Sequence, residues 1–193
     1  AVTPLCANTE RTAVAGAREG TSCPLRPGTS ANLWASCSSK KLWGLGAGEQ
    51  TTMSCMTKNL QEVLKLLGKS SYFDRVLEKM TVVSAVPGKV ICEMKVEEEH
   101  TNKMGTLHGG MIATLVDCVS TYVLLCTERG APGVSVDMNI TYMSPAKMGE
   151  DILITAHILK QGKTLAFASV DLTNKVTGKL IAQGRHTKHL GTA

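Results

Sequence analysis

The stretch that decides the fold is Asn102–Gly130, which reads NKMGTLHGGMIATLVDCVSTYVLLCTERG. A polar turn and His108-Gly109-Gly110 lead into apolar residues at spacings of three and four, the pattern of a helix packed on one broad face. That pattern comprises Met111, Ile112, Leu115, Val116, Val119, Tyr122, Val123 and Cys126. Gly130 can take the left-handed conformation that commonly ends a helix. We therefore expect one long helix around which the rest of the domain is organised.

Asp117 interrupts this apolar pattern. The run is about as long as a membrane span, but a charged side chain at its middle is costly in lipid, so we expect a buried helix of a soluble protein. For a lone Asp, the simplest interpretation is a polar helix edge that touches solvent or a subunit boundary. The glycines at the helix start favour a functional interpretation, because free N–H groups there can hold an oxyanion.

Composition narrows the class of protein. The 193 residues suffice for one ordinary domain, and with 43% apolar but only 4% aromatic residues the core must be aliphatic. The net charge of +5 fits either solubilising surface lysines or attraction of an anionic substrate. Arginines are not interleaved with aromatics, so we expect no nucleic-acid partner. The seven cysteines have neither C-x-x-C nor zinc spacing, which predicts no metal and suits a reducing compartment.

Residues 1–52 differ from the rest of the chain. They are rich in Ala, Gly, Ser, Thr and Pro and lack apolar periodicity, so we expect a disordered N-terminal leader or extension before a domain at 53–193. A leader from an alternative start or gene model is the favoured interpretation. A mitochondrial transit peptide is the alternative, since basic residues outnumber acidic ones, although acidic residues are present. An interaction arm has the least support.

The remaining segments predict a mixed α+β fold. A helical stretch is expected over Met56–Met80, with a break at Gly68. Alternating apolar residues predict strands at Thr81–Val86, Lys89–Val96, Val134–Met143, Asp151–Leu159, Leu165–Leu172 and Lys179–His189. In the strand from Val134, strict alternation places Ser135 with Asp137 on one face and Tyr142 on the other. We therefore expect a long central helix against an antiparallel sheet of five to six strands.

H-G-G at the start of a long helix, with an Asp two turns further on, resembles the hotdog-fold thioesterases. The resemblance extends from about Met53 to Gly191 and is carried by HTNKMGTLHGGMIATLVD, RGAPGVSVDMNITYMSPAKMGE and GKTLAFASVDLTNKVTGKLIAQGRHTKH. It implies a sheet wrapped around the helix, dimers that pair edge to edge, and a homotetramer of two such dimers. It also implies an acyl-CoA thioesterase that hydrolyses medium- to long-chain fatty acyl-CoA to fatty acid and CoA.

The same resemblance assigns catalytic roles to five residues. Asn102 matches an asparagine near the attacking group, and Gly109 matches the residue whose N–H polarises the thioester carbonyl. His108 matches a histidine that orients the site. Asp117 matches the general base or nucleophile, and Ser135 the hydroxyl that positions water. In the family, the last two act across a dimer interface from the first three.

Each of these residues also has a simpler interpretation. Asn102 can be a turn residue or helix cap, His108 a structural imidazole, and Ser135 an ordinary strand serine. The combination in family order favours function. Because G-x-S-x-G and metal motifs are absent, a carboxylate route remains, and no cofactor is expected. We favour water activation by Asp117 over direct attack.

The turn from Lys160 to Leu165 suits the phosphates of CoA. It reads KQGKTL and offers two lysines and a glycine that lets backbone N–H groups converge. The resemblance implies that the CoA contacts are Asp137, Tyr142, Lys160, Gln161, Gly162, Lys163, Thr164, Leu165 and His189. An ordinary charged hairpin explains the turn equally well. The acyl chain is expected in an apolar channel beside the central helix.

Two other functions compete with hydrolysis. Hotdog dehydratases also use a His and a carboxylate on thioesters, but the H-G-G-then-Asp order disfavours that chemistry. A non-catalytic module that senses acyl-CoA is the alternative from another class. The resemblance further implies association with a phosphatidylcholine transfer protein. A cytoplasmic location is expected, with mitochondria as the alternative.

Overall fold

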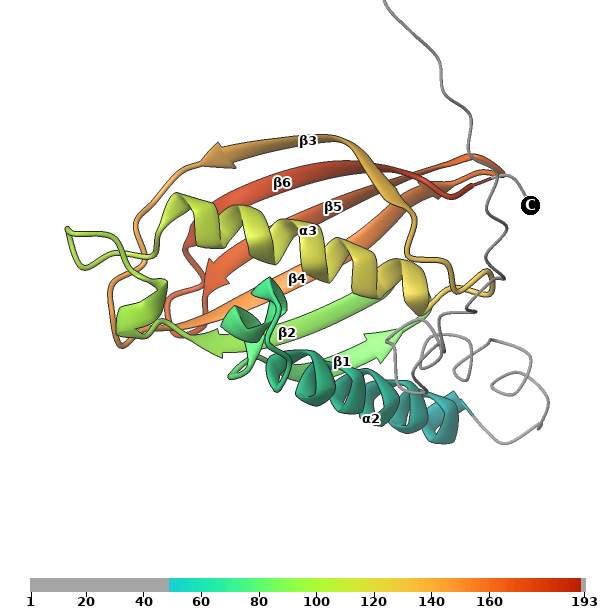
Figure 1. The fold of residues 1–193 in the computed structure, drawn as a ribbon, viewed down its shortest axis with the longest axis horizontal. Coiled ribbons are helices and arrows are strands. Elements are labelled where there is room, and N and C mark those ends of the chain that lie inside the picture. Colours follow the sequence, from blue (N-terminus) through green and yellow to red (C-terminus); the bar gives the residue numbers. More distant parts are fainter. Residues whose placement is uncertain (1–48, 192–193) are drawn as a thin grey trace, which may run out of the picture. The chain divides into compact units, whose positions relative to one another are not determined.

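The computed structural model describes residues 49–191, which form an α+β domain (Figure 1). Its helices are α2 (Glu49–Gly68), the 3-10 helix η2 (Phe73–Leu77), the 3-10 helix η3 (Glu98–His100) and α3 (Gly109–Leu125). Its strands are β1 (Thr81–Val86), β2 (Lys89–Lys95), β3 (Val134–Tyr142), β4 (Asp151–Gln161), β5 (Leu165–Asn174) and β6 (Leu180–His189). They form one antiparallel sheet in the order β1-β2-β4-β5-β6-β3. The expected hotdog arrangement of a sheet around a central helix is confirmed.

The predicted helical stretch before the sheet is confirmed, with a different start. α2 begins at Glu49, so residues 49–52, which we assigned to the disordered leader, are helical. The rest of the predicted leader, residues 1–48, lies outside the described residues. The helix ends at Gly68 as expected. A Cβ there would lie 2.7 Å from the Cα of Glu78, so glycine allows the segment after η2 to approach. α2 packs beside β1 at the edge of the sheet opposite β3 (Figure 1).

α3 supplies the centre of the core. Leu115, Val116, Val119 and Val123 of its predicted apolar face are fully buried. Each such side chain contributes about 1.5–3 kcal/mol relative to exposure. Asp117 interrupts this face without breaking it, because its side chain leaves the core at the side nearest β3 and β6.

Gly184 of β6 lets α3 approach the sheet. A Cβ at this position would lie 2.5 Å and 2.8 Å from the two γ carbons of Val116, closer than carbon atoms pack. An isolated glycine inside a strand often marks such a close approach. Gly184 therefore fixes the distance at which Asp117, next to Val116, stands above the sheet.

β3 contains a bulge that changes which residues face α3. Ser135 pairs with Lys188 and Asp137 with Thr187, so Val136 is an extra residue. The predicted alternation is correct from Asp137 onward but wrong for Ser135. Because directly opposed residues share a face, the bulge turns Ser135 toward α3, on the same side as Tyr142.

We predict that Gly184→Ala destabilises the domain by about 1–3 kcal/mol, because the added methyl group overlaps Val116. In a Val116→Ala background, the same substitution should cost less than about 0.5 kcal/mol, since the space is then open. Urea unfolding of the four proteins in this cycle measures both values. An equal cost in the two backgrounds would contradict the close-approach explanation.

Candidate functional site

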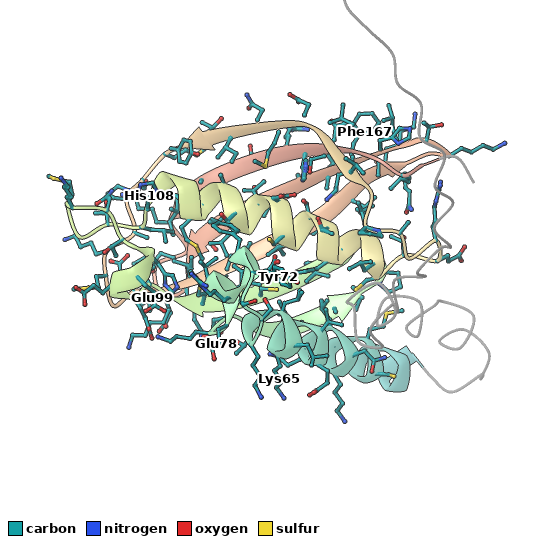
Figure 2. The ribbon with its side chains drawn as sticks, in the orientation of Figure 1. Lys65, Tyr72, Glu78, Glu99, His108 and Phe167 are labelled. Atoms are coloured by element: carbon teal, nitrogen blue, oxygen red, sulfur yellow. The ribbon has the colours of Figure 1, made fainter. Side chains whose placement is uncertain are left out.

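The N-terminus of α3 carries one half of the candidate site. His108 is the N-cap, and its Nδ1 accepts a hydrogen bond of 2.8 Å from the N–H of Gly110. The neutral ring therefore carries its proton on Nε2, which remains able to donate to another group. Figure 2 shows His108 at this end of the helix, where the side chain is exposed. The expected orienting histidine is thus itself oriented by the helix start.

Asn102 shapes the turn that precedes this helix. Its Oδ1 accepts from the N–H groups of Met104, at 2.9 Å, and Thr106, at 3.3 Å. Its Nδ2 lies 3.0 Å from Thr106 Oγ1. These contacts confirm the interpretation of Asn102 as a turn residue. The side chain is half-buried and hydrogen-bonded within this turn.

Gly109 begins the helix beside a cleft of about 300 Å³. The Tyr142 hydroxyl donates to the Gly109 carbonyl at 3.3 Å, and a Cβ on Gly109 would lie 3.5 Å from the tyrosine ring. The cleft is lined by Leu107, Gly109, Ile112, Tyr142, Met143, Ser144 and Pro145. Its lining is mostly apolar, while the first N–H groups of a helix have no partner within the helix. An acyl group and a carbonyl oxygen are both suited to such surroundings.

Asp117 is the centre of the second half. Its Oδ1 lies 3.3 Å from Ser135 Oγ, 3.6 Å from Lys188 Nζ and 3.7 Å from His186 Nδ1. The carboxylate side chain is 47% exposed, whereas Lys188 as a residue is 4% exposed. The structure therefore brings Ser135 to Asp117 as expected, and it places a buried cation behind the carboxylate.

The charges around Asp117 oppose one another. Burial lowers the pKa of Lys188, and the Asp117 carboxylate opposes that effect; Lys188 also bonds Thr121 Oγ1. Burial, together with the Lys188 charge, lowers the pKa of His186, against the carboxylates of Asp117 and Asp137. The imidazole lies 2.7 Å from Ser120 Oγ. Lys188 is thus the cation that faces Asp117, while His186 favours its neutral form.

Sequence reasoning missed Lys188 and His186. The signal was present, because alternation along β6 places both on the face of the buried Ala182 and Gly184. Lysine is almost never fully buried without a partner, so this pattern calls for an acidic residue opposite the strand. Asp117, the acidic residue within the apolar pattern of the central helix, was a candidate for this partner.

One chain does not bring the two halves together. Asp117 follows Gly109 by eight residues, which is about 12 Å along the helix axis. A group that activates water and an N–H that polarises the carbonyl must both lie within hydrogen-bond reach of the reacting atoms. The described chain therefore holds the two groups at separate places along α3.

The expected CoA contacts are also divided. His189 pairs with Leu165 beside the β4–β5 turn, and parity places Asp137 and His189 on the face opposite α3. Tyr142 faces α3 at the other end of β3, eight residues or about 26 Å from Val134, which pairs with His189. The turn borders a cleft of about 590 Å³ lined by Pro87, Thr127, Glu128, Arg129, Gln161, Gly162 and Lys163.

Two further features of residues 49–191 bear on function. No group of three or more His, Cys, Asp or Glu side chains there could hold a metal ion. In the same part of the chain, no helix is long and apolar enough to cross a membrane.

The chain belongs to the thioesterase superfamily. The family model matches residues 104–181, which include α3 and part of the turn before it. It is 80% identical over 139 residues to acyl-coenzyme A thioesterase 13 of Mus musculus, covering 72% of this chain and 99% of that protein. The structure of zebra fish thioesterase superfamily member 2 matches with 69% identity and a TM-score of 0.69, over 70% of this chain and 98% of the other. A hypothetical thioesterase protein with coenzyme A from Streptococcus pneumoniae TIGR4 matches at 27% identity and a TM-score of 0.56, over 60% and 88% of the two chains.

We predict that His186 makes stability fall on acidification. Its pKa is below the ordinary 6.5, so between that lowered pKa and 6.5 the unfolded chain binds more protons than the folded one. The free energy of unfolding should therefore decrease as pH falls through this window. His186→Gln should flatten the dependence, with His157→Gln as control, in urea titrations from pH 7.5 to 5.5. Identical slopes for wild type and His186→Gln would contradict this assignment.

Proposed function

We propose that this chain hydrolyses medium- to long-chain fatty acyl-CoA thioesters to free fatty acid and CoA. The observation that carries the proposal is the Asp117 carboxylate, half exposed and held between Ser135 and Lys188 on the central helix of a thioesterase-superfamily fold. Similarity over nearly the whole length of a mouse protein named acyl-coenzyme A thioesterase 13 supports the substrate class.

The reaction follows from the chemistry of the two halves. The thioester oxygen lies at the start of α3, where the Gly109 N–H and the helix dipole stabilise the negative charge that develops on it. Asp117 of a second copy accepts a proton from water that Ser135 positions, and the water oxygen bonds to the carbonyl carbon. Collapse of the tetrahedral intermediate breaks the C–S bond, and the CoA thiolate leaves and receives the proton that Asp117 accepted from water. Direct attack by Asp117, through an anhydride that water then cleaves, is the alternative.

The oxyanion half contains Asn102 and His108 in supporting roles. His108 offers its Nε2 proton beside the helix start, because Nδ1 is already bonded to Gly110. Asn102 lies in the turn that leads to the helix, tied back by Thr106. The apolar cleft beside Gly109 would receive the first part of the acyl chain.

The assembly is proposed as a homotetramer made of two edge-paired dimers. β3 is an edge strand whose residues are exposed except for the half-buried Ile140, and it holds Ser135 beside Asp117. Edge strands present unpaired backbone groups that a second copy can satisfy. Pairing there would bring another chain toward the Asp117 cluster. Association with a phosphatidylcholine transfer protein and a cytoplasmic or mitochondrial location are proposed from the resemblance.

We expect the full chain to release thiol from myristoyl-CoA and palmitoyl-CoA. Asp117→Asn should lower kcat by about 10²–10⁴-fold, because the amide keeps the shape but cannot accept the proton. Asp151→Asn, a matched change at the start of β4, is the control. Near-native turnover by Asp117→Asn would refute the carboxylate assignment. Binding of the ester without release by wild type would favour an acyl-CoA sensor, and hydration of an enoyl thioester a dehydratase.

A mixed assembly tests whether the site is shared between copies. Asp117→Asn and His108→Ala chains should each be strongly impaired alone, since each lacks one half of every site. After denaturation and refolding together, random pairing should restore about a quarter of wild-type activity, because half of the dimers then contain one intact site. Activity that stays at the level of the separate variants would place both halves within one chain.

A further inference from the structure

Arg129 joins two segments that lie far apart in the sequence. Its Nη1 donates to the carbonyl of Lys163 in the β4–β5 turn. Its Nη2 donates to the carbonyls of Leu190 and Gly191, at 3.1 Å each, just beyond the end of β6. Arg129 itself belongs to the loop after α3. One guanidinium therefore fastens the end of the central helix to the turn and to the segment that follows His189.

The hydrogen bonds around Arg129 make these segments one unit. The N–H of Leu190 donates to Thr164 at 2.8 Å, and Gln161 Nε2 donates to Thr127 Oγ1 at 3.3 Å. His189 Nδ1 accepts a hydrogen bond of 3.2 Å from the N–H of Gly191. Because the carbonyl of Gly191 is bound by Arg129, this residue links the guanidinium to the imidazole.

The guanidinium is committed to the protein backbone. An arginine offers five N–H donors in a rigid fork, and here both terminal nitrogens bind carbonyl oxygens. On the turn itself, the side chains of Lys160 and Lys163 are exposed cations that can meet a phosphate. The geometry of Arg129 therefore suits it to hold the turn in place. The lysines of the turn are then the groups that contact the phosphate.

We propose that Arg129 is the positioning residue for recognition of the CoA nucleotide. This inference rests on the proposed function, in which the turn from Lys160 to Leu165 and His189 contact the nucleotide. By fixing three segments before the substrate arrives, Arg129 removes the ordering cost that a loose turn would incur on binding. Its effect is specific to the nucleotide part of the substrate, because the Asp117 cluster involves other residues of β6 and α3.

The experiment compares a substrate that has the nucleotide with one that lacks it. The full chain and Arg129→Gln are assayed with decanoyl-CoA and with S-decanoylpantetheine, which share the thioester. We expect Arg129→Gln to raise KM for decanoyl-CoA at least about tenfold with kcat within about twofold, since the binding energy that is lost is shared equally by the ground state and the transition state. Its kcat/KM for the pantetheine ester should stay within about twofold of wild type.

Arg129→Lys and Arg75→Gln complete the comparison. Lysine keeps the charge but lacks the fork that spans two segments, so its KM for decanoyl-CoA should lie between those of wild type and Arg129→Gln. If Arg129→Gln does not fold, Arg129→Lys carries the same test. Arg75 is an exposed arginine of η2 whose Nη1 donates to the carbonyl of Ser71. Its substitution should change neither KM nor kcat for either ester.

Other outcomes overturn the inference. Equal losses for both esters would mean that Arg129 supports the whole domain, and no loss for decanoyl-CoA would mean that the turn needs no support. Calorimetric binding of CoA itself separates this question from catalysis. If wild type hydrolyses neither ester, the proposed function fails, yet a Kd for CoA that rises at least about tenfold in Arg129→Gln still supports the positioning role. An unchanged Kd refutes it.

Discussion

The packing of α3 against the sheet is the constraint on which the rest of the structure depends. Val116 rests on a glycine of β6, so the helix lies as close to the strand as backbone and side chain allow. At that distance a carboxylate of the next residue can meet side chains from β3 and β6. The aliphatic core thus does more than stabilise the fold, because it sets the height of the polar cluster above the sheet.

Burying Lys188 beneath α3 costs free energy, and the polar side chains of Asp117 and Thr121 offset part of that cost. A lysine ammonium inside the domain loses most of its hydration, and an opposing carboxylate and hydroxyl compensate for only part of that loss. The carboxylate retains an exposed side, so it can serve both as the partner of a buried cation and as a reactive group. The lowered pKa of the neighbouring His186 helps to limit how many positive charges the cluster must hold.

Much of the fold could be predicted from sequence, because each apolar pattern has a period that only one type of element satisfies. The central helix, the hairpins and the strand boundaries follow that rule to within a few residues. The orientations and partners of the side chains around the site followed less directly from these periods. Ser135 faced the helix against strict alternation, since one extra residue shifts the parity of the strand. The partners of Asp117 on β6 are distant in sequence, and Arg129 acts through backbone carbonyls, which leave no signature in residue identity.

The bulge at Val136 has a consequence for how such chains diverge. A single residue count between Gly133 and Asp137 decides whether a hydroxyl looks inward or outward, whatever amino acids stand nearby. Deleting or inserting one residue there would exchange the inner and outer faces of the strand's first residues while the remainder stayed in register. In this segment, the number of residues therefore decides which side chains face the central helix. Two relatives with matching letters but different spacing would present different chemistry to the central helix.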